Sequence, residues 1–259
     1  MDLLSFVSEA KRIGADGVEL LDFFYKDADT ERPAVKARLD ELGLPCPIFS
    51  VANNFAKLEK SDREAQVDRI KFGVDEAVFY GAKVVRVFAG DVAEGLTYDQ
   101  VRMWIVEGLT DAANYAHDRG VRLALENHGK LAGRGDQVRA LIQDVRSNCG
   151  HDAMGANPDT GNFVLVDEDS VRAVTEIGDM AYMVHFKDFV PGKGVFSSFS
   201  GKTFRGSVIG EGCVDLAGCV KALKACGFDS WLSLEYEGEG DPVSEVERSL
   251  VNARNLVSA

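Results

Sequence analysis

Long apolar runs are missing from this sequence of 259 residues. No run approaches the roughly 20 apolar residues that a membrane-spanning helix needs, so we expect no membrane partner. The N-terminal stretch MDLLSFVSEAKR has no basic segment followed by a long apolar one, and it therefore does not resemble a secretory signal peptide. Together these absences predict a soluble cytoplasmic protein.

Cysteine is scarce and shows no pattern. The chain has five cysteines, an odd number, and none forms a Cys-x-x-Cys pair. This usage predicts reduced thiols, most of them packing residues, and it argues against a disulfide framework or a cysteine-based zinc site.

Positive charge is in short supply. The chain has 29 Lys and Arg against 42 Asp and Glu, a net charge of −13, and no run of basic residues. Such a field repels phosphate backbones, so a nucleic-acid partner is disfavoured. Because 46% of the residues are apolar, the chain can bury a large core. No linker or low-complexity tract divides it, and we predict one domain over residues 1–259.

The sequence does contain a recurring phrase, in which an amphipathic segment ends, a glycine follows and a short apolar run begins. Glycine just past a helix takes the left-handed conformation that ends it. Short runs dense in Val, Ile, Leu and Phe are typical of strands covered on both faces. The phrase begins at Gly14, Gly43, Gly81, Gly120 and Gly227.

Two more runs, MGANPDT and YMVHFKDF, have a composition typical of strands, but no helix-ending glycine precedes them. Alternating strands and helices predict an α/β fold, most simply a (β/α) TIM barrel with the helices outside. The count is seven strands, because the chain opens inside a helix. We therefore predict that the first strand is absent and leaves an opening. A late start of the sequence and a filling of the gap from elsewhere both stay open as explanations.

Local signals place some of the boundaries. Ser61 and Thr97 each begin a pattern that fits a helix capping box, and Asp215 fits the N-cap of a late helix. The polar segment from Pro191 to Gly212 reads as an unusually long loop. Long loops at barrel mouths are often lids, so we expect this one to cover the site.

Four successive predicted strands end in a potential metal ligand. In a barrel the chemistry lies at the C-terminal ends of the strands, and neighbouring strand ends are only about 5 Å apart. Three carboxylates crowded around one imidazole either raise their pKa values or recruit a cation. We predict one divalent ion, and the donor set suits Mn²⁺, Mg²⁺ or Co²⁺ better than Zn²⁺. The predicted ligands are Glu126, Asp159, His185 and Glu235.

The motifs LALENHG, NPDTGNF, VHFKDF and LSLEYEG follow one another in this order, after GADGVELLDFF and VVRVFAG. They resemble the sugar phosphate isomerase/epimerase family with the xylose isomerase-like TIM barrel, over nearly the whole chain. The resemblance implies that the four predicted ligands hold one Mn²⁺, Mg²⁺ or Co²⁺ ion. A homo-oligomer is common in such barrels and stays open.

The resemblance also implies a reaction. In the ketose epimerases of that family, two glutamates act as acid and base on opposite faces of the substrate, and by position these are Glu126 and Glu235. The metal stabilises a cis-enediolate. The implied function is an isomerase or epimerase of a small keto-sugar or related polyol ketone, in carbohydrate metabolism. The physics agrees, since a Lewis acid stabilises the anion and two carboxylates can relay the proton.

Polar residues beside the strand ends are candidates for binding the substrate. His128 and Lys187 lie two residues after predicted ligands and so face the same way on an extended chain. The structural alternatives are a hydrogen-bonded rim network for His128 and, for Lys187, a salt bridge with a rim carboxylate such as Asp188. Arg86 ends a buried strand and needs a site carboxylate or the substrate as its partner.

Three further candidates rest on weaker signals. Asn162 stands where many relatives have histidine, which puts an epimerase substrate in doubt but not the metal site. Arg205 is the match to an arginine that the resemblance implies for gripping substrate oxygens. Asn53 follows the strand FSVA and could bind sugar hydroxyls, although asparagine is also common in turns.

Other functions compete with the isomerase. A lyase on the same scaffold, of the inosose or dehydroshikimate dehydratase type, also begins by removing a proton beside a carbonyl, and the sequence does not separate the two. A metal-binding subunit without turnover stays open because a gapped barrel positions a site less precisely. An endonuclease IV-type phosphodiesterase is disfavoured, since it needs several zinc ions and many histidines and this chain has four.

Overall fold

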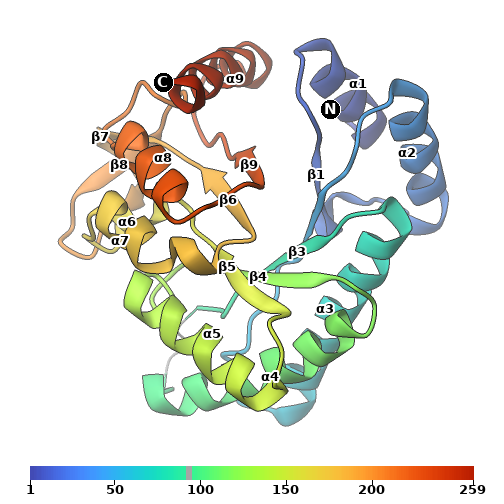
Figure 1. Ribbon diagram of the computed structural model, residues 1–259, viewed down its shortest axis with the longest axis vertical. Helices are drawn as coiled ribbons and strands as arrows, with labels where there is room; N and C mark the ends of the chain where they lie inside the picture. The colour runs from blue at the N-terminus through green and yellow to red at the C-terminus, as the bar shows by residue number, and fades with distance from the viewer. Residues whose placement is uncertain (92–94) are drawn as a thin grey trace.

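The computed structural model describes residues 1–91 and 95–259. Parallel strands form the wall of an open barrel and helices cover its outside (Figure 1). The wall strands are β1 (Glu19–Leu21), β2 (Ile48–Ser50), β3 (Val84–Val87), β4 (Arg122–Glu126), β5 (Met154–Asn157), β6 (Met183–Phe186) and β9 (Trp231–Leu234). The α/β TIM-barrel prediction is confirmed.

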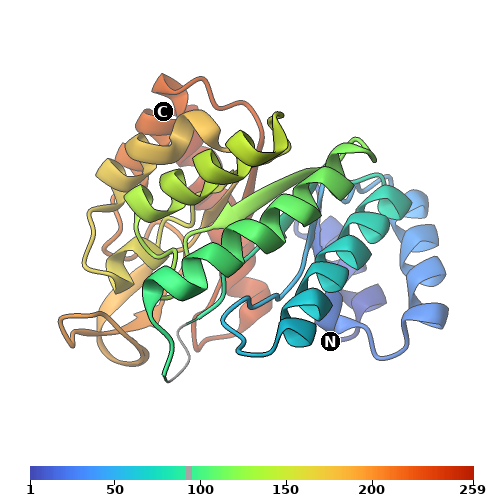
Figure 2. The same cartoon turned by 90° about the horizontal axis from the view of Figure 1, so that it is seen from below.

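The helices on the outside alternate with the strands along the chain. Figure 2 shows the long central helices lying side by side across the barrel. No helix in the described ranges is both long and apolar enough to cross a membrane. The α-helices are α1 (Leu3–Arg12), α2 (Ala28–Leu42), α3 (Lys60–Tyr80), α4 (Tyr98–His117), α5 (Gly135–Cys149), α6 (Asn162–Leu165), α7 (Ser170–Ile177), α8 (Leu216–Ala225) and α9 (Pro242–Ser258). Two short 3₁₀ helices are η1 (Asp22–Phe24) and η2 (Gly178–Met180).

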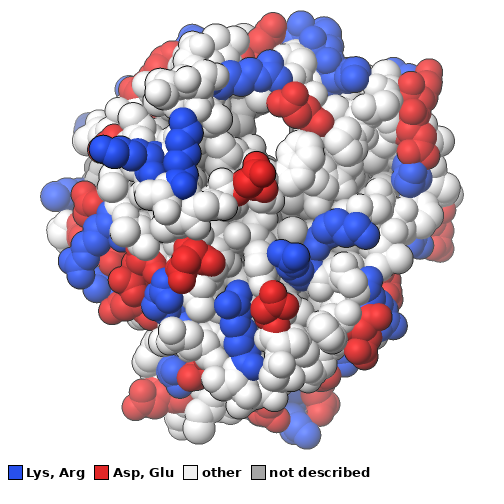
Figure 3. Space-filling model, in the orientation of Figure 1, with Lys and Arg blue, Asp and Glu red and all other residues white. Residues whose placement is uncertain are grey.

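The strands follow one another around the wall in chain order. Strands β1 to β5 form one parallel sheet, and β6 pairs in parallel with β9. Isolated parallel bridges, Ala156 with Ala181 and Asp159 with His185, connect the two sheets. In the described part of the chain β9 and β1 do not pair, and the space-filling view is hollowed between α9 and α1 (Figure 3). We call this junction of β9 and β1 the seam.

Side chains, and not backbone hydrogen bonds, join the two edges of the seam. Trp231 packs over Gly17, where an added Cβ would lie 3.2 Å from the indole ring. A hydrogen bond from Ser233 of β9 reaches Glu19 of β1. Ion pairs between exposed side chains link the neighbouring helical segments, Arg12 with Glu247 and Arg254 with Asp16, each at 3.1 Å.

Strands β2 to β6 are buried along almost their whole length, as the apolar runs predict. The glycine prediction is confirmed, because all five glycines of the recurring phrase have positive φ, from 58° to 84°. The Thr97 capping box is also confirmed, and Asp215 caps α8. The box at Ser61 is wrong: the N-cap of α3 is Glu59, two residues earlier, and it makes no side-chain cap hydrogen bond.

The segment predicted as a long loop after Pro191 is largely an antiparallel hairpin, β7 (Phe189–Ser197) with β8 (Thr203–Gly206). Pro191, Gly192 and Gly194 disguise the first strand, since proline and glycine are poor strand formers, and the pairing is irregular between Pro191 and Phe196. The lid role stays a prediction.

Beyond the hairpin, the carboxylate of Asp188 fixes the chain that leads to α8. It accepts the backbone N–H groups of Gly210 at 3.0 Å, Gly212 at 2.8 Å and Val214 at 3.1 Å. A Cβ at Gly212 would overlap this carboxylate, which explains the glycine there. The anchor holds the hairpin and α8 against the end of β6.

Candidate metal centre

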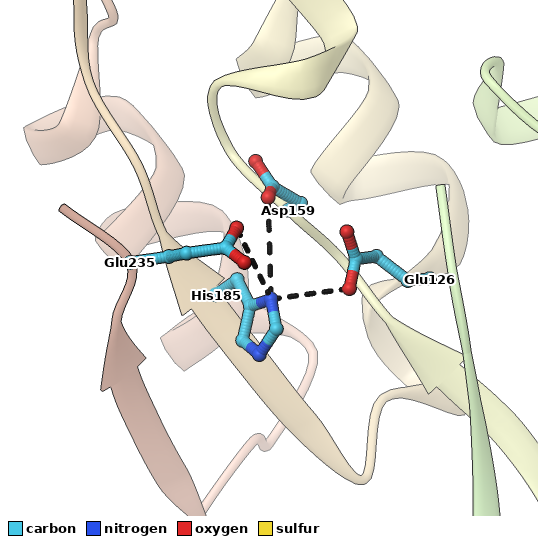
Figure 4. Close-up of side chains that lie close together, drawn as sticks. All are labelled: Glu126, Asp159, His185 and Glu235. Atoms are coloured by element: carbon cyan, nitrogen blue, oxygen red, sulfur yellow. Dashed lines mark ion pairs between the residues drawn. The ribbon is translucent and has the colours of Figure 1, made fainter. Parts of the chain in front are cut away.

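The four predicted ligands come together at the C-terminal ends of four neighbouring wall strands. Figure 4 shows their side chains converging on one space. One ligand atom from each residue lies within 4.8 Å of all the others. Glu126 is the last residue of β4, Asp159 follows β5, His185 is in β6 and Glu235 directly follows β9. The parallel strands end at one edge, which is why residues so far apart in the sequence meet.

The imidazole of His185 lies in the middle of the carboxylates. Its Nδ1 atom is 3.2 Å from Glu126 Oε2, 3.6 Å from Glu235 Oε2 and 4.0 Å from Asp159 Oδ2. The side chains of Glu126, Asp159 and His185 are at most 2% exposed, whereas that of Glu235 is 31% exposed. Glu235 is therefore the ligand that meets solvent.

Buried atoms in the cluster lack hydrogen bonds. Asp159 Oδ2, His185 Nδ1 and Glu235 Oε2 are all buried and make no hydrogen bond of good geometry among the described residues. Asp159 Oδ2 and Glu235 Oε2 are in ion-pair contact with Lys187 Nζ, at 3.0 Å and 2.6 Å. A buried polar atom without a partner costs about 1–3 kcal/mol, more for a charged group. These three atoms point toward one space, so a single divalent cation would satisfy all of them, and the donor set fits the predicted ion.

The electrostatics of the cluster show the same need for a cation. Burial raises the pKa of Asp159 to about 8, and the neighbouring Glu235 and Glu126 push it in the same direction. Burial lowers the pKa of His185, but the surrounding carboxylates outweigh burial and hold that pKa well above its usual value. Without a metal ion, protons on these groups take the place of its charge.

Glu19 of β1 was not predicted, yet it orients the central imidazole. Its Oε2 lies 3.0 Å from His185 Nε2, and it also accepts a hydrogen bond from Ser50. Burial raises the pKa of Glu19, but His185 and Arg86 lower it more, to about 2. A carboxylate on the far nitrogen of a metal-binding histidine fixes its tautomer and raises its basicity.

Arg86 has the site partner that the sequence demanded. Its Nε is 3.2 Å from Glu126 Oε2, and its Nη1 donates to the carbonyl of Val51 at 3.0 Å. The guanidinium also lies 4.1 Å from the ring centroid of Phe88. Arg86 therefore holds the Oε2 atom of Glu126 by its positive charge.

Asparagine side chains frame the two most buried ligands. Asn162 donates to Glu126 Oε1 at 3.1 Å, and Asn157 donates to Glu126 Oε2 at 3.3 Å. Asn127 bridges Asp159 by accepting its N–H at 2.6 Å and donating to its carbonyl at 3.0 Å. Asn162, predicted to bind substrate, thus touches a ligand, and Asn127 and Asn157 were missed.

Lys187 reaches into the cluster and does not pair with Asp188. Its Nζ lies 2.6 Å from Glu235 Oε2, 3.0 Å from Asp159 Oδ2 and 3.4 Å from Glu237 Oε2. Burial lowers the pKa of Lys187, but these carboxylates hold it well above its usual value. Within the described residues, five carboxylates, those of Glu19, Glu126, Asp159, Glu235 and Glu237, face the fixed cations Arg86 and Lys187. A divalent ion offsets most of the remaining negative charge.

The other three candidates lie elsewhere. The amide of Asn53 is used by the backbone of Phe88, donating to its carbonyl at 2.6 Å and accepting its N–H at 2.9 Å. His128 is exposed, and its ring lies 4.7 Å from that of Phe88. Arg205 is exposed on β8. Their roles in substrate binding stay predictions.

A cavity of about 530 Å³ leads to the cluster along the seam. Glu19, Arg86, His185 and Glu235 lie at its polar end. Leu21, Phe24 and Tyr236 are among the residues of its sides. A small molecule that enters here meets the cluster from the side of Glu235.

Comparison with known proteins agrees with this geometry. Residues 7–255 match the sequence model of a family described as a xylose isomerase-like TIM barrel. The chain is 25% identical over 250 residues to the inosose dehydratase of Clostridium beijerinckii, a match that covers 89% of this chain and 80% of that protein.

Two solved structures illustrate the shared fold. A 3-keto-D-glucoside 4-epimerase from E. coli matches with a TM-score of 0.78 at 17% identity, over 98% of this chain and 94% of the other. A xylose isomerase-like TIM-barrel protein from Mycobacterium smegmatis in complex with magnesium matches with a TM-score of 0.74 at 18% identity, over 98% and 88%. At such identities these likenesses establish the fold alone.

Proposed function

Because this chain belongs to the xylose isomerase-like TIM-barrel family, we propose that it is a divalent-metal-dependent isomerase or epimerase of a small keto-sugar or related polyol ketone. The reaction moves a proton at the carbon beside the carbonyl, through a cis-enediolate. The proposed ion is Mn²⁺, Mg²⁺ or Co²⁺, chosen for the oxygen-rich donor set. One structural neighbour is a complex with magnesium and another binds a zinc atom, which supports a divalent ion at this place.

One observation carries the proposal: two carboxylates from different strands, those of Glu126 and Glu235, reach the same imidazole nitrogen at 3.2 Å and 3.6 Å (Figure 4). We place a ketone bound beside this centre so that each carboxylate approaches a different face of its acidic carbon. One carboxylate then removes the proton and the other returns a proton, without a large rearrangement. When bound, the metal ion supplies Lewis acidity to the carbonyl oxygen.

The two glutamates are held differently, and this suggests how they divide the work. Glu126 is fixed by Arg86 and by the amides of Asn157 and Asn162, so it acts from a rigid position. Glu235 lines the cavity, so it meets an entering substrate first. We therefore assign the first proton removal to Glu235 and the return of the proton to Glu126.

Lys187 supplies a fixed positive charge on the same side. Its ammonium is 5% exposed and lies 2.6 Å from Glu235 Oε2. A buried cation at this place stabilises the negative charge that develops on a substrate oxygen as the proton leaves. Water has little access to the buried ligands, which protects an enediolate from quenching.

Isotope exchange tests the proposal. The Mn²⁺-loaded protein is incubated in heavy water with a panel of keto-sugars, keto-glucosides and keto-cyclitols, and deuterium at carbon is measured by mass spectrometry. We expect exchange in the wild type and none in Glu126→Gln or Glu235→Gln. Glu107→Gln, on the outside of α4, is the matched control and should exchange normally. Exchange that survives both site substitutions would exclude the two-carboxylate mechanism.

A dehydratase is the second candidate, and the inosose dehydratase relative favours it. Both reactions begin with the same proton, but a dehydratase then expels a β-hydroxyl, which needs a proton donor at that oxygen. Lys187, buried among the carboxylates, is the nearest such donor to Glu235. Loss of water from a keto-cyclitol, seen as a mass decrease, would identify the dehydratase. Metal binding without exchange into any ketone would identify a subunit without turnover.

A further inference from the structure

We infer that Thr160 is a positioning residue for Lys187, because its buried hydroxyl bonds both backbone groups of that lysine and thereby sets the direction of the ammonium. The role rests on the proposed function, in which the charge of Lys187 stabilises a substrate oxygen. Thr160 belongs to a short segment, residues 159–162, of which every member lies against Lys187.

Lys187 stands just beyond the regular strand pairing of the wall. Strand β6 pairs with β9 as far as Phe186, and the last bridge on its other side joins His185 to Asp159. The next residue, Lys187, is itself only 4% exposed. A buried backbone N–H needs a partner, and here the partner has to come from outside the ladder.

The hydroxyl of Thr160 supplies that partner. It accepts the N–H of Lys187 at 3.0 Å and donates to the carbonyl of the same residue at 2.8 Å. Thr160 is fully buried, and its own backbone is fixed on both sides. Its N–H donates to the carbonyl of His185 at 3.0 Å, and its carbonyl accepts the hydroxyl of Ser170 at 2.7 Å. The backbone of Lys187 is therefore held by one rigid side chain, which sets where its own side chain starts.

Gly161 makes room for the aliphatic part of that side chain. A Cβ added at Gly161 would lie 2.7 Å from Cγ and 3.0 Å from Cβ of Lys187, and 3.0 Å from the ring of Phe189. Carbon atoms cannot approach so closely without displacement. Any residue larger than glycine would push the lysine stem away from its present path.

Asn162 receives the ammonium at the end of this path. Its amide nitrogen donates to Glu126 Oε1 at 3.1 Å, so its amide oxygen faces the other way and lies 3.2 Å from Lys187 Nζ. The ammonium is thus held beside Glu235 Oε2, at 2.6 Å. Backbone, stem and head of Lys187 are each fixed by one residue of the same segment.

A structural role is the alternative for Thr160. The hydroxyl would then only satisfy buried backbone groups, and its loss would impair the protein whether or not residue 187 is a lysine. A positioning role differs in that Thr160 acts through Lys187. A double-mutant cycle separates the two, because effects that pass through one residue do not add.

The test measures kcat and KM for deuterium exchange in the Mn²⁺-loaded protein. Thr160→Val should lower kcat at least about tenfold and change KM less than about threefold, because a misplaced charge affects the transition state more than substrate binding. Thr160→Ser keeps the hydroxyl and should retain at least about half of the wild-type kcat. Lys187→Met should lower kcat at least as much as Thr160→Val. The double variant should be no slower than Lys187→Met alone.

Thr175→Val is the matched control. Its hydroxyl donates to the carbonyl of Val171 at 2.7 Å on the exposed face of α7, far in role from the cluster. It should keep the wild-type kcat. Gly161→Ala makes the same test with the Thr160 hydroxyl in place, and it serves if Thr160→Val does not fold. It should lower kcat as Thr160→Val does, since its methyl group displaces the lysine stem.

A second readout does not depend on turnover. Lysines are acetylated with acetic anhydride, and the labelling of Lys187 is measured by peptide mass spectrometry relative to Lys60, whose side chain is 75% exposed. Lys187 should react slowly in the wild type and at least about threefold faster in Thr160→Val and Gly161→Ala, because a displaced side chain is more accessible. Thr175→Val should react like the wild type.

Labelling of Lys187 that is unchanged in both variants would overturn the inference. So would a loss of kcat from Thr160→Val that adds in full to the loss from Lys187→Met. Exchange into no ketone by the wild type would instead overturn the proposed function, and the labelling would then decide by itself whether Thr160 holds Lys187.

Discussion

The two sides of the metal cluster are built in opposite ways. On the β4–β5 side, Glu126 and Asp159 are 1% and 0% exposed and are framed by the amides of Asn127 and Asn162. On the β9 side, Glu235 is 31% exposed, and its strand pairs with β6 on one edge alone in the described chain. The comparison teaches that rigidity and access are separated: one side fixes its carboxylates by buried hydrogen bonds, and the other lies along the cavity.

The largest effect should come from the core behind each side. Leu125→Ala, at a fully buried position of β4, should lower the free energy of unfolding by about 2–5 kcal/mol through lost burial and a cavity. Leu234→Ala, at a half-buried position of β9, should cost less than half as much. Urea denaturation of both variants measures the difference. Equal losses would show that the two sides are equally tight.

The next effect concerns the imidazole between the two sides. Glu19→Gln should weaken Mn²⁺ binding about 10–100-fold, because it removes the carboxylate that orients His185. Glu237→Gln should weaken binding less, since Glu237 lies near the cluster through Lys187. Calorimetric titration with Mn²⁺ measures both. Unchanged affinity in Glu19→Gln would show that the rest of the cluster fixes the ring without it.

A smaller effect separates structure from function at the ends of β2 and β3, next to the tight side. Asn53→Ala should destabilise the fold by about 1–2 kcal/mol, because two backbone groups of Phe88 lose their partner. Metal affinity should stay at the wild-type value, since none of these hydrogen bonds touches a ligand. Thermal melting and metal titration report the two quantities. A raised KM for the ketone with normal stability would instead support the sequence-based role in substrate binding.

The smallest effect should come from the seam itself. Arg254→Ala removes an ion pair with Asp16 between side chains that are 50% and 75% exposed, so it should cost less than about 1 kcal/mol. Chemical denaturation at low and high salt gives the value. If the free energy of unfolding fell by more than about 2 kcal/mol, surface ion pairs would contribute strongly to the junction of β9 and β1. The β9 side would then be more rigid than the comparison with the β4–β5 side implies.

The clustering of the four proposed metal ligands could be predicted because these residues combine two strong sequence signals. Each ends a short apolar run, and parallel strands bring their ends to one edge. Glu19 escaped because it is the first of the three residues of β1, whereas the prediction searched the C-terminal ends of the strands. The available signal was a glutamate between two apolar residues, Val18 and Leu20, both of which are buried.

The substrate contacts were harder to predict, for a physical reason. The alternation of side chains along a strand predicts which way a side chain points, but it does not predict which group it hydrogen-bonds. Asn53 hydrogen-bonds the backbone of Phe88, and Asn162 hydrogen-bonds the carboxylate of Glu126. In the hairpin β7–β8, cross-strand pairing outweighed the local signals of proline and glycine, so the segment was mistaken for a loop.

The ammonium of Lys187 bears on the order in which this protein is assembled. It is part of the chain, so its charge is present from the moment the barrel closes around the carboxylates. Folding therefore does not have to wait for an ion to arrive. We therefore expect metal binding to be a separate step that follows folding. A chelator should leave the protein folded but inactive, and added metal should restore its activity.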